Sequence, residues 1–433
     1  MLVKRIQLGL LHVAVAMTLV PINSTLNRVM IKELAISATL VAILASLPYL
    51  FSPIQVAIGS FSDRHPLFGW RRTPYIFLGL LLCVSGVIIS PLAAYTLVKS
   101  FWVGIVLGSL AFGAWGMGYN LASVSYLSLA SELSGEKGRS KTIAVMFFMM
   151  ITSIILTAIT LGRMVDPYTP QALMRAFWAI GFIALFLGIV GLVKLEKRNA
   201  VDEMATAEYS WLTLVRAVFA NRQAALFFIY LVILLAAILG QDVLLEPFAA
   251  EAFGLPVQST TRITSIWGTC VLIALALAGL TEGRLRKRTV AQFGGVGALL
   301  GFILITISGI SASQPVFYSG VMLLGIGTGL STVSNLSLML DMTIAGEVGL
   351  YIGAWGMANA VSRLTGTVLA GIGRDVISSL AQSPVTGYVV VFAIEAFFIV
   401  FSLWLLGRVN VGAFRREAQY APLVEQAALA NDV

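Results

Sequence analysis

Residues 100–131 carry no Asp, Glu, Lys or Arg and read SFWVGIVLGSLAFGAWGMGYNLASVSYLSLAS. About 20 predominantly apolar residues in helical conformation are enough to cross the hydrocarbon core of a bilayer. A transmembrane strand is excluded, because the stretch is long and continuous and does not alternate between apolar and polar residues. This stretch therefore predicts one membrane-spanning α-helix.

The same pattern recurs along the chain. A run at 289–340 is too long for one crossing, and the turn sequence at 311–315 divides it in two. Two more apolar segments, 349–373 and 385–407, are each interrupted by one charge. The other uncharged runs are 6–27, 34–62, 73–98, 142–162, 176–193, 223–241 and 263–281. Together these segments predict an all-α integral membrane protein with twelve transmembrane helices.

Composition supports this class. Of the 433 residues, 58% are hydrophobic and 11% charged, with a mean hydropathy of +0.93. Soluble domains carry about 25% charged residues, so a soluble enzyme, a disordered protein and a secreted disulfide scaffold are excluded. Cys83 and Cys270 lie in apolar stretches and are interpreted as small core residues. The first apolar run exceeds the about 7–15 residues of a signal peptide core, so it is predicted to be the first span.

Basic residues predict the orientation. With the N-terminus taken as cytoplasmic, the cytoplasmic loops and termini carry 20 Lys and Arg residues and the opposite loops carry 7. This excess predicts that both termini are cytoplasmic and accounts for the net charge of +8 without nucleic acid. The longest loop predicts an N-terminal six-helix bundle at 1–193, a cytoplasmic linker at 194–222, a C-terminal bundle at 223–410 and a cytoplasmic tail at 411–433.

The two halves resemble each other. A shift of 209 residues places Gly116 and Gly118 on Gly325 and Gly327, and it places Glu132 on Asp341. These matches predict a duplication of a six-helix unit, and two such halves in parallel orientation resemble the major facilitator superfamily. The loop residues Gly59, Asp63, Arg64, Arg71 and Arg72 resemble that superfamily's loop motif, in which an Asp and basic residues latch one conformation. An ordinary positive-inside loop is the alternative, because residues 65–70 stretch the motif.

Four segments carry a narrower resemblance. They are TLNRVMI at 25–31, GWRRTPY at 69–75, QDVLLEPF at 241–248 and GAWGMANA at 353–360. In this order and in both halves they are similar to the bacteriochlorophyll delivery, or PUCC-type, family of the major facilitator superfamily. The resemblance implies an assembly factor for photosynthetic light-harvesting complexes. Its implied cargo is a (bacterio)chlorophyll, and its implied partners are antenna polypeptides, the pigment's synthesis machinery and membrane lipid. The implied location is the bacterial cytoplasmic or photosynthetic membrane.

Candidate pigment contacts follow from residue chemistry. Trp115, Tyr119 and Tyr126 share one face of the fourth helix, which lines the central cavity in the superfamily; ordinary aromatic packing is the alternative. His12, in the first helix, is a candidate magnesium ligand or else a buried, hydrogen-bonded histidine. Trp355 belongs to the fourth resembling segment and is a further candidate.

Charged residues supply the remaining candidates. Asn27 and Arg28 follow Pro21 near the outer end of helix one, where Arg28 contacts either lipid headgroups or a pigment ester.

Asp242 and Glu246, spaced by four, are expected on one helical face near Pro247. They orient a partner's basic group, hydrogen-bond a pigment's polar edge or supply an oxygen ligand to its magnesium; hydration at the membrane interface is the alternative. At the negative end of the helix dipole they need a compensating contact.

Arg363 and Glu395 lie near the midpoints of helices eleven and twelve and predict an intramembrane ion pair.

Two functions remain open from the sequence. The first is the assembly factor, and the second is a proton-coupled secondary transporter of an amphipathic molecule or pigment precursor. No nucleotide-binding loop, metal-ligand cluster or nucleophile–base constellation is found in the sequence, so enzyme activity and a resident metal are not expected. The identity of the pigment, the partner polypeptide, the oligomeric state and the phototroph lineage are not predicted.

Overall fold

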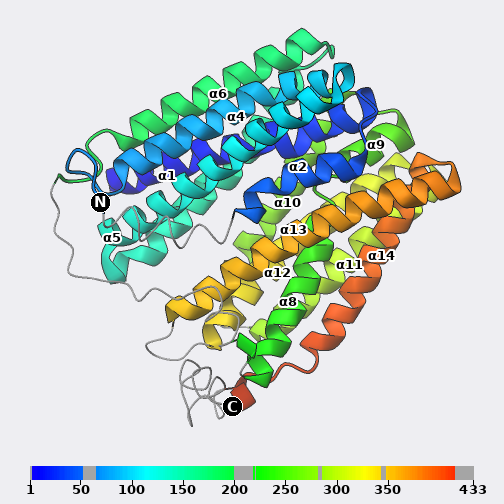
Figure 1. The fold of residues 1–433 in the computed structure, drawn as a ribbon. Coiled ribbons are helices and arrows are strands. Elements are labelled where there is room, and N and C mark those ends of the chain that lie inside the picture. Colours follow the sequence, from blue (N-terminus) through cyan, green and yellow to red (C-terminus); the bar gives the residue numbers. More distant parts are fainter. Residues whose placement is uncertain are drawn as a thin grey trace, which may run out of the picture. The chain divides into compact units, whose positions relative to one another are not determined.

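The computed structural model describes residues 2–51, 65–198, 218–219, 221–280, 285–342 and 348–414. Nearly all of the described chain is helical, and its one β feature is an isolated bridge between Leu67 and Trp70 (Figure 1). The elements are α1 (Leu2–Met17), η1 (Pro21–Leu26), η2 (Val29–Glu33), α2 (Ala38–Leu50), α4 (Thr73–Lys99), α5 (Phe101–Met164), α6 (Pro170–Leu192), α8 (Arg222–Gly240), α9 (Leu245–Phe253), α10 (Val257–Leu280), α11 (Lys287–Ser311), α12 (Gln314–Asp341), α13 (Val348–Ala381) and α14 (Pro384–Leu406).

These helices confirm the predicted fold class. Within the described ranges, ten helices are long and apolar enough to cross a membrane. The other two predicted spans correspond to α2, a shorter apolar helix of 13 residues, and to α13, which carries Arg363 and Arg374. The predicted motif residues Gly59, Asp63 and Arg64 lie outside the described residues, as do most of the linker and nearly all of the tail.

The predicted fourth and fifth spans form one element that doubles back. Within α5 the backbone leaves the helical region at Gly135, where φ is 60° and ψ is 172°. Only glycine adopts this combination readily, because a Cβ would clash with the backbone. The two arms, Phe101–Gly135 and Lys141–Met164, each qualify as a membrane span (Figure 1).

Contacts gather the chain into two units. Unit 1 comprises residues 1–206 together with 242–268, and unit 2 comprises 207–241 together with 269–433. The division at 206–207 lies inside the predicted linker. Residues 242–268, from helices seven and eight of the predicted order, are assigned to unit 1 by their contacts and not by their place in the chain.

The duplication is visible in matching helix pairs. In unit 1, α4 packs on α5, and a Cβ added to Gly79 would lie 2.8 Å from the Gly118 carbonyl oxygen. In unit 2, α11 packs on α12, and a Cβ added to Gly294 would lie 3.0 Å from the Gly327 carbonyl oxygen. Gly118 and Gly327 are the residues matched by the 209-residue shift. Each unit therefore brings two helix backbones together at equivalent glycines.

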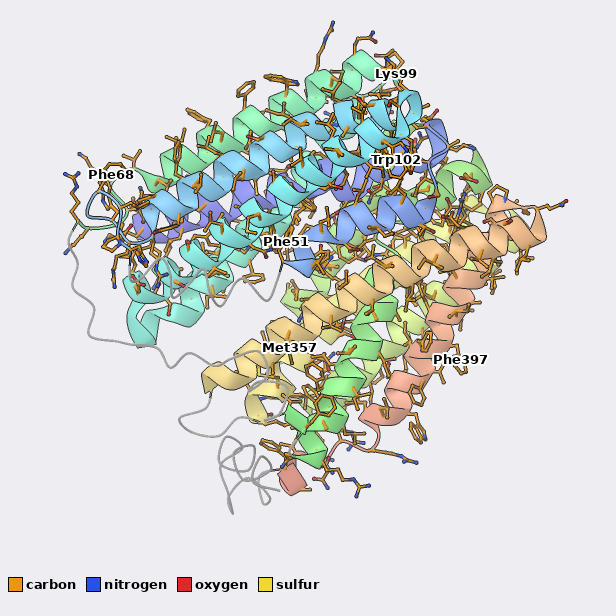
Figure 2. All side chains as sticks on the ribbon, in the orientation of Figure 1. Phe51, Phe68, Lys99, Trp102, Met357 and Phe397 are labelled. Carbon is orange, nitrogen blue, oxygen red and sulfur yellow. The ribbon has the colours of Figure 1, made fainter. Side chains whose placement is uncertain are left out.

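Large apolar side chains cover the outside of the helices. Trp102 at the start of α5 is 77% exposed and Phe397 on α14 is 68% exposed, and Figure 2 shows both pointing away from their helices. Such faces are costly in water and stable against acyl chains, as expected for membrane-spanning helices.

Candidate functional site

The first helix is irregular at its outer end. After α1, the chain continues through the two π-helical segments η1 and η2, and Pro21 occupies the first position of η1. π-helical turns are rare and concentrate at functional sites, because the extra residue in the turn redirects side chains. Here they bury a run of polar side chains, Ser24, Thr25, Asn27 and Arg28.

Helix seven of the predicted order is broken. α8 ends at Gly240, residues 241–244 form turns, and α9 begins at Leu245. The expectation that Asp242 and Glu246 share one face of a continuous helix is therefore wrong. Glu246 lies in the first turn of α9, where the helix dipole favours negative charge, so the predicted dipole penalty is also wrong. Pro247 fits there because the first helical turn needs no N–H from it.

Glu246 is the centre of a buried polar cluster in unit 1. The side chain is 4% exposed, which excludes simple hydration at the membrane interface. Its Oε1 accepts hydrogen bonds from the hydroxyl of Ser24 on η1 and, at 2.7 Å, from the hydroxyl of Thr264 on α10. Its Oε2 has no hydrogen-bond partner among the described residues. Beside this carboxyl, Thr25 and Thr261 join the same two elements through hydroxyls 3.0 Å apart.

Arg28 is the positive charge of this cluster. One terminal nitrogen is paired with Glu33, and the other donates to the Leu255 carbonyl oxygen at 3.2 Å. The Arg28 residue is 3% exposed, and its charge also acts electrostatically on Glu246. Its Nε, like Oδ1 of Asn27, has no partner in the described part of the chain. The structure thus brings together Arg28 and Glu246, which the sequence placed in two separate candidate sets.

Sequence reasoning missed Ser24, Thr264 and Glu33. Hydroxyl residues are frequent in membrane helices, where they usually bond their own backbone, so neither Ser24 nor Thr264 stands out. Glu33 ends the first uncharged stretch and looks like an ordinary loop acid. A polar residue within an apolar run is expected to have a polar partner, but the sequence does not show which residue that partner is.

A second polar group lies near Arg28 and Glu33, whose charges act on Tyr168. The hydroxyls of Tyr95 and Tyr168 lie 3.0 Å apart, and burial raises the pKa of the Tyr168 phenol. With its amide oriented to suit both neighbours, Gln258 donates to Asp166 at 3.1 Å and accepts from Arg262 at 3.2 Å. These contacts tie the 165–169 loop to α4 and to α10.

The aromatic face of helix four is largely internal to unit 1. Trp115 is fully buried, and its indole N–H donates to the Thr18 hydroxyl at 3.1 Å. Tyr126 is 1% exposed and belongs to the unit's apolar core, with Tyr119 packed against that core. These contacts are ordinary aromatic packing, which was the alternative to pigment binding predicted for this face.

His12 sits in an aromatic cluster. Its ring centroid lies 5.2 Å from that of Tyr126 and 5.1 Å from that of Phe147, which meets it edge-on. His12 is 6% exposed, and its Nδ1 has no hydrogen-bond partner among the described residues. Phe147 is 44% exposed, so this cluster reaches the surface of unit 1.

Arg71 and Arg72 anchor a charged cluster before α4. Both guanidinium groups pair with Glu132, at 3.5 Å and 3.2 Å. The Glu196 carboxylate accepts the backbone N–H groups of Arg71, Arg72 and Thr73 at 2.7–3.2 Å, capping α4. In unit 2, Asp341, the repeat partner of Glu132, pairs with Lys287 at the start of α11 at 2.8 Å. Of the predicted loop motif, the structure therefore describes Arg71 and Arg72.

Unit 2 holds the remaining candidates. Trp355 lines an apolar pocket of about 30 Å³ together with Phe227, Leu231 and Met339. Glu395 is buried on α14, and a Cβ added to Gly240 would lie 2.5 Å from the Glu395 Oε1. Arg363 is half-buried on α13. The ion pair between these two charges stays a prediction.

Solved structures are similar to the whole chain. The nucleoside transporter NupG aligns with a TM-score of 0.71 at 14% identity, covering 94% of this chain and 98% of that one. A bacterial homolog to the human lysosomal transporter Spinster aligns with a TM-score of 0.74 at 10% identity, covering 95% and 97%. At such low identity these similarities concern the fold alone, which is that of the major facilitator superfamily.

Sequence relatives are much nearer. Protein PucC of Cereibacter sphaeroides is 32% identical over 414 residues, covering 92% of this chain and 90% of that protein. The "Bacteriochlorophyll synthase 44.5 kDa chain" of Rhodobacter capsulatus is 28% identical over 415 residues, covering 93% and 94%. The family model described as PUCC protein matches residues 25–414. By this match over residues 25–414, the chain belongs to the PUCC family.

Proposed function

We propose that this protein is an assembly factor that binds or delivers (bacterio)chlorophyll to light-harvesting antenna polypeptides within the membrane. Membership of the PUCC family over residues 25–414 carries the proposal. A relative named as a bacteriochlorophyll synthase chain supports the link to this pigment class. The protein acts by binding and release, with the pigment as cargo, and no covalent step is assigned to its residues.

The edge formed by His12 and Phe147 is the proposed pigment contact, and Tyr126 packs behind it in the core. A macrocycle needs flat apolar neighbours and one nitrogen or oxygen that reaches its magnesium, and the imidazole of His12 offers such a nitrogen. Phe147 supplies the exposed edge at which a pigment first binds. The Trp355 pocket is a weaker candidate, because its volume of about 30 Å³ is far below the roughly 300–1,000 Å³ of ligand pockets.

Proton-coupled transport is the second candidate function. Proton coupling usually requires a buried acid, and Glu246 is a buried acid. The fold shared with transporters is compatible with this function too. The proposed location for either function is the photosynthetic or cytoplasmic membrane, with both termini in the cytoplasm.

Pigment co-purification tests the primary proposal. The protein is isolated in mild detergent from a strain that makes bacteriochlorophyll, and its absorption spectrum is recorded together with the identity of bound polypeptides. We expect pigment absorption that falls severalfold in His12→Phe, and antenna polypeptides in the same fraction. Phe186→Leu, at a 65% exposed position on α6, is the matched control and retains the pigment.

Two results together would contradict the assembly proposal. If wild-type protein carries no pigment, and if antenna complexes accumulate normally in a strain lacking it, the assembly proposal is wrong. Uptake of a small molecule driven by a proton gradient in vesicles containing the pure protein would then favour transport.

A further inference from the structure

Glu246 is a buried acid that pigment binding at His12 does not use. It lies in unit 1, on the first turn of α9, and its carboxyl is enclosed by hydroxyl groups from η1 and α10. Arg28 is the opposite charge that acts on it, and Arg28 already pairs with Glu33. The formal charges of Arg28, Glu33 and an ionised Glu246 sum to −1. A buried cluster with this excess charge is costly unless a cation neutralises it.

The hydrogen bonds distinguish the two forms of the carboxyl. An ionised carboxylate spreads its charge over two acceptor oxygens, and burying either without a donor is expensive. Here both donors converge on Oε1, and Oε2 has none among the described residues. A protonated carboxyl suits this geometry. With the proton on Oε1, it donates to the Ser24 oxygen, accepts from Thr264, and leaves at Oε2 only a carbonyl oxygen.

We propose that Glu246 is a proton-binding site of this protein, and that loss of its proton draws Arg28 from Glu33 and the Leu255 carbonyl toward Glu246. The proton comes from water and returns to water, and no other bond changes. Glu33 is the end of the cluster open to solvent, because its side chain is 35% exposed while that of Arg28 is 4% exposed. Proton uptake is thereby coupled to the contacts that hold η2 against the start of α10.

Other charged groups near the site have separate positions. On α9, Glu251 follows by about one turn and is half-buried; Asp242 precedes α9 on the 241–244 turn. On α10, Arg262 is exposed and engaged by Gln258. On η2, Lys32 is exposed beside Glu33. Arg28 is thus the charge that an ionised Glu246 would recruit.

Infrared spectroscopy of the purified protein in lipid tests this assignment. At about pH 7, where an exposed Glu is ionised, we expect a carbonyl stretching band of a protonated carboxylic acid. The band shifts in heavy water and disappears in Glu246→Gln, which keeps the size and the hydroxyl contacts. Glu251→Gln on the same helix is the control and retains the band. The comparison with Glu246→Gln separates this band from any signal of the buried Glu395.

A second variant covers failure of Glu246→Gln to fold. Ser24→Ala removes one hydrogen bond from Oε1, so we expect the band to move to higher frequency while the protein stays folded. Absence of a protonated-carboxyl band in the wild type, or an unchanged band in both variants, overturns the proposal. Loss of the band on adding sodium, but not choline, at constant pH identifies a sodium site and also overturns it.

The inference is independent of the cargo. The infrared measurement uses no pigment, so a missing band leaves the assembly proposal standing. A pigment-free preparation that shows the band leaves the proton site standing.

Discussion

At the scale of single residues, buried polar groups with one partner each stabilise unit 1. Trp115 is the largest example, since its indole N–H reaches only the hydroxyl of Thr18 in the contacts described. Thr18 in turn donates to the Val15 carbonyl oxygen at 2.6 Å, so the hydroxyl oxygen is held in place as an acceptor. This arrangement makes Thr18 a positioning residue for the aromatic face of helix four.

Replacing Thr18 by Val tests that role. The substitution preserves shape and removes the acceptor, so the indole N–H is left buried without a partner. The expected cost is about 1–3 kcal/mol, seen as a lower midpoint of thermal unfolding in detergent. Thr160→Val is the control, because that exposed hydroxyl bonds only to its own helix and should change the midpoint little. Equal midpoints for wild type and Thr18→Val would contradict this account.

At the scale of elements, the α4–α5 and α11–α12 pairs depend on glycine. A Cβ on Gly118 would lie 2.5 Å from both the Cys83 nitrogen and the Gly79 carbonyl oxygen. A Cβ on Gly327 would lie 2.7 Å from the Gly294 carbonyl oxygen. Both contacts are with backbone, which cannot rotate away, so the helices themselves must separate.

We therefore expect Gly118→Ala and Gly327→Ala to destabilise the protein by similar amounts, about 1–3 kcal/mol each. The control is Gly113→Ala on α5, where the nearest atom, in Phe51, lies 3.9 Å away. That substitution should be neutral or stabilising by up to about 1 kcal/mol, since Ala favours helix over Gly. Thermal unfolding of the three purified variants measures the difference, and a loss as large in Gly113→Ala would refute the packing argument.

The predicted pair of Arg363 on α13 and Glu395 on α14 is also an element-scale property. Removing one partner of a buried pair typically costs about 3–5 kcal/mol, because the other charge stays buried. We expect Arg363→Met and Glu395→Gln each to reduce the amount of folded protein in the membrane, and the double variant to recover most of it. Additive losses in the double variant would mean that these two charges have different partners.

At the scale of the whole molecule, the basic loops predict the orientation in the membrane. We expect a thiol introduced at Lys197, just after α6, to react with a membrane-impermeant reagent only from the cytoplasmic side. A thiol at Gln171, exposed at the start of α6, should react only from the opposite side. The native thiols are a small background, because Cys83 is buried and Cys270 is partly buried within a span. The reverse labelling pattern would contradict the predicted orientation and place both termini on the opposite side.

Hydrophobicity alone determined the helical membrane class and the order of the spans. Within a bilayer, an apolar segment of this kind can form its backbone hydrogen bonds only as a helix. This level of structure is therefore local and can be predicted from the sequence. The duplication could be predicted too, because the close backbone contacts at Gly118 and Gly327 make any larger residue costly at these matched positions. The four quoted segments likewise carried the family, which the match over 25–414 confirms.

Only the tertiary structure decided which polar residues meet. Ser24 and Glu246 are 222 positions apart, and no period or spacing relates them. The break at 241–244 turned Glu246 from the end of one helix to the start of another, which reversed its interaction with the helix dipole. The sequence made Arg28 a candidate, but it did not predict its partners Glu33 and Leu255. The sequence shows that a charge within an apolar span needs a partner, but long-range packing decides which residue becomes that partner.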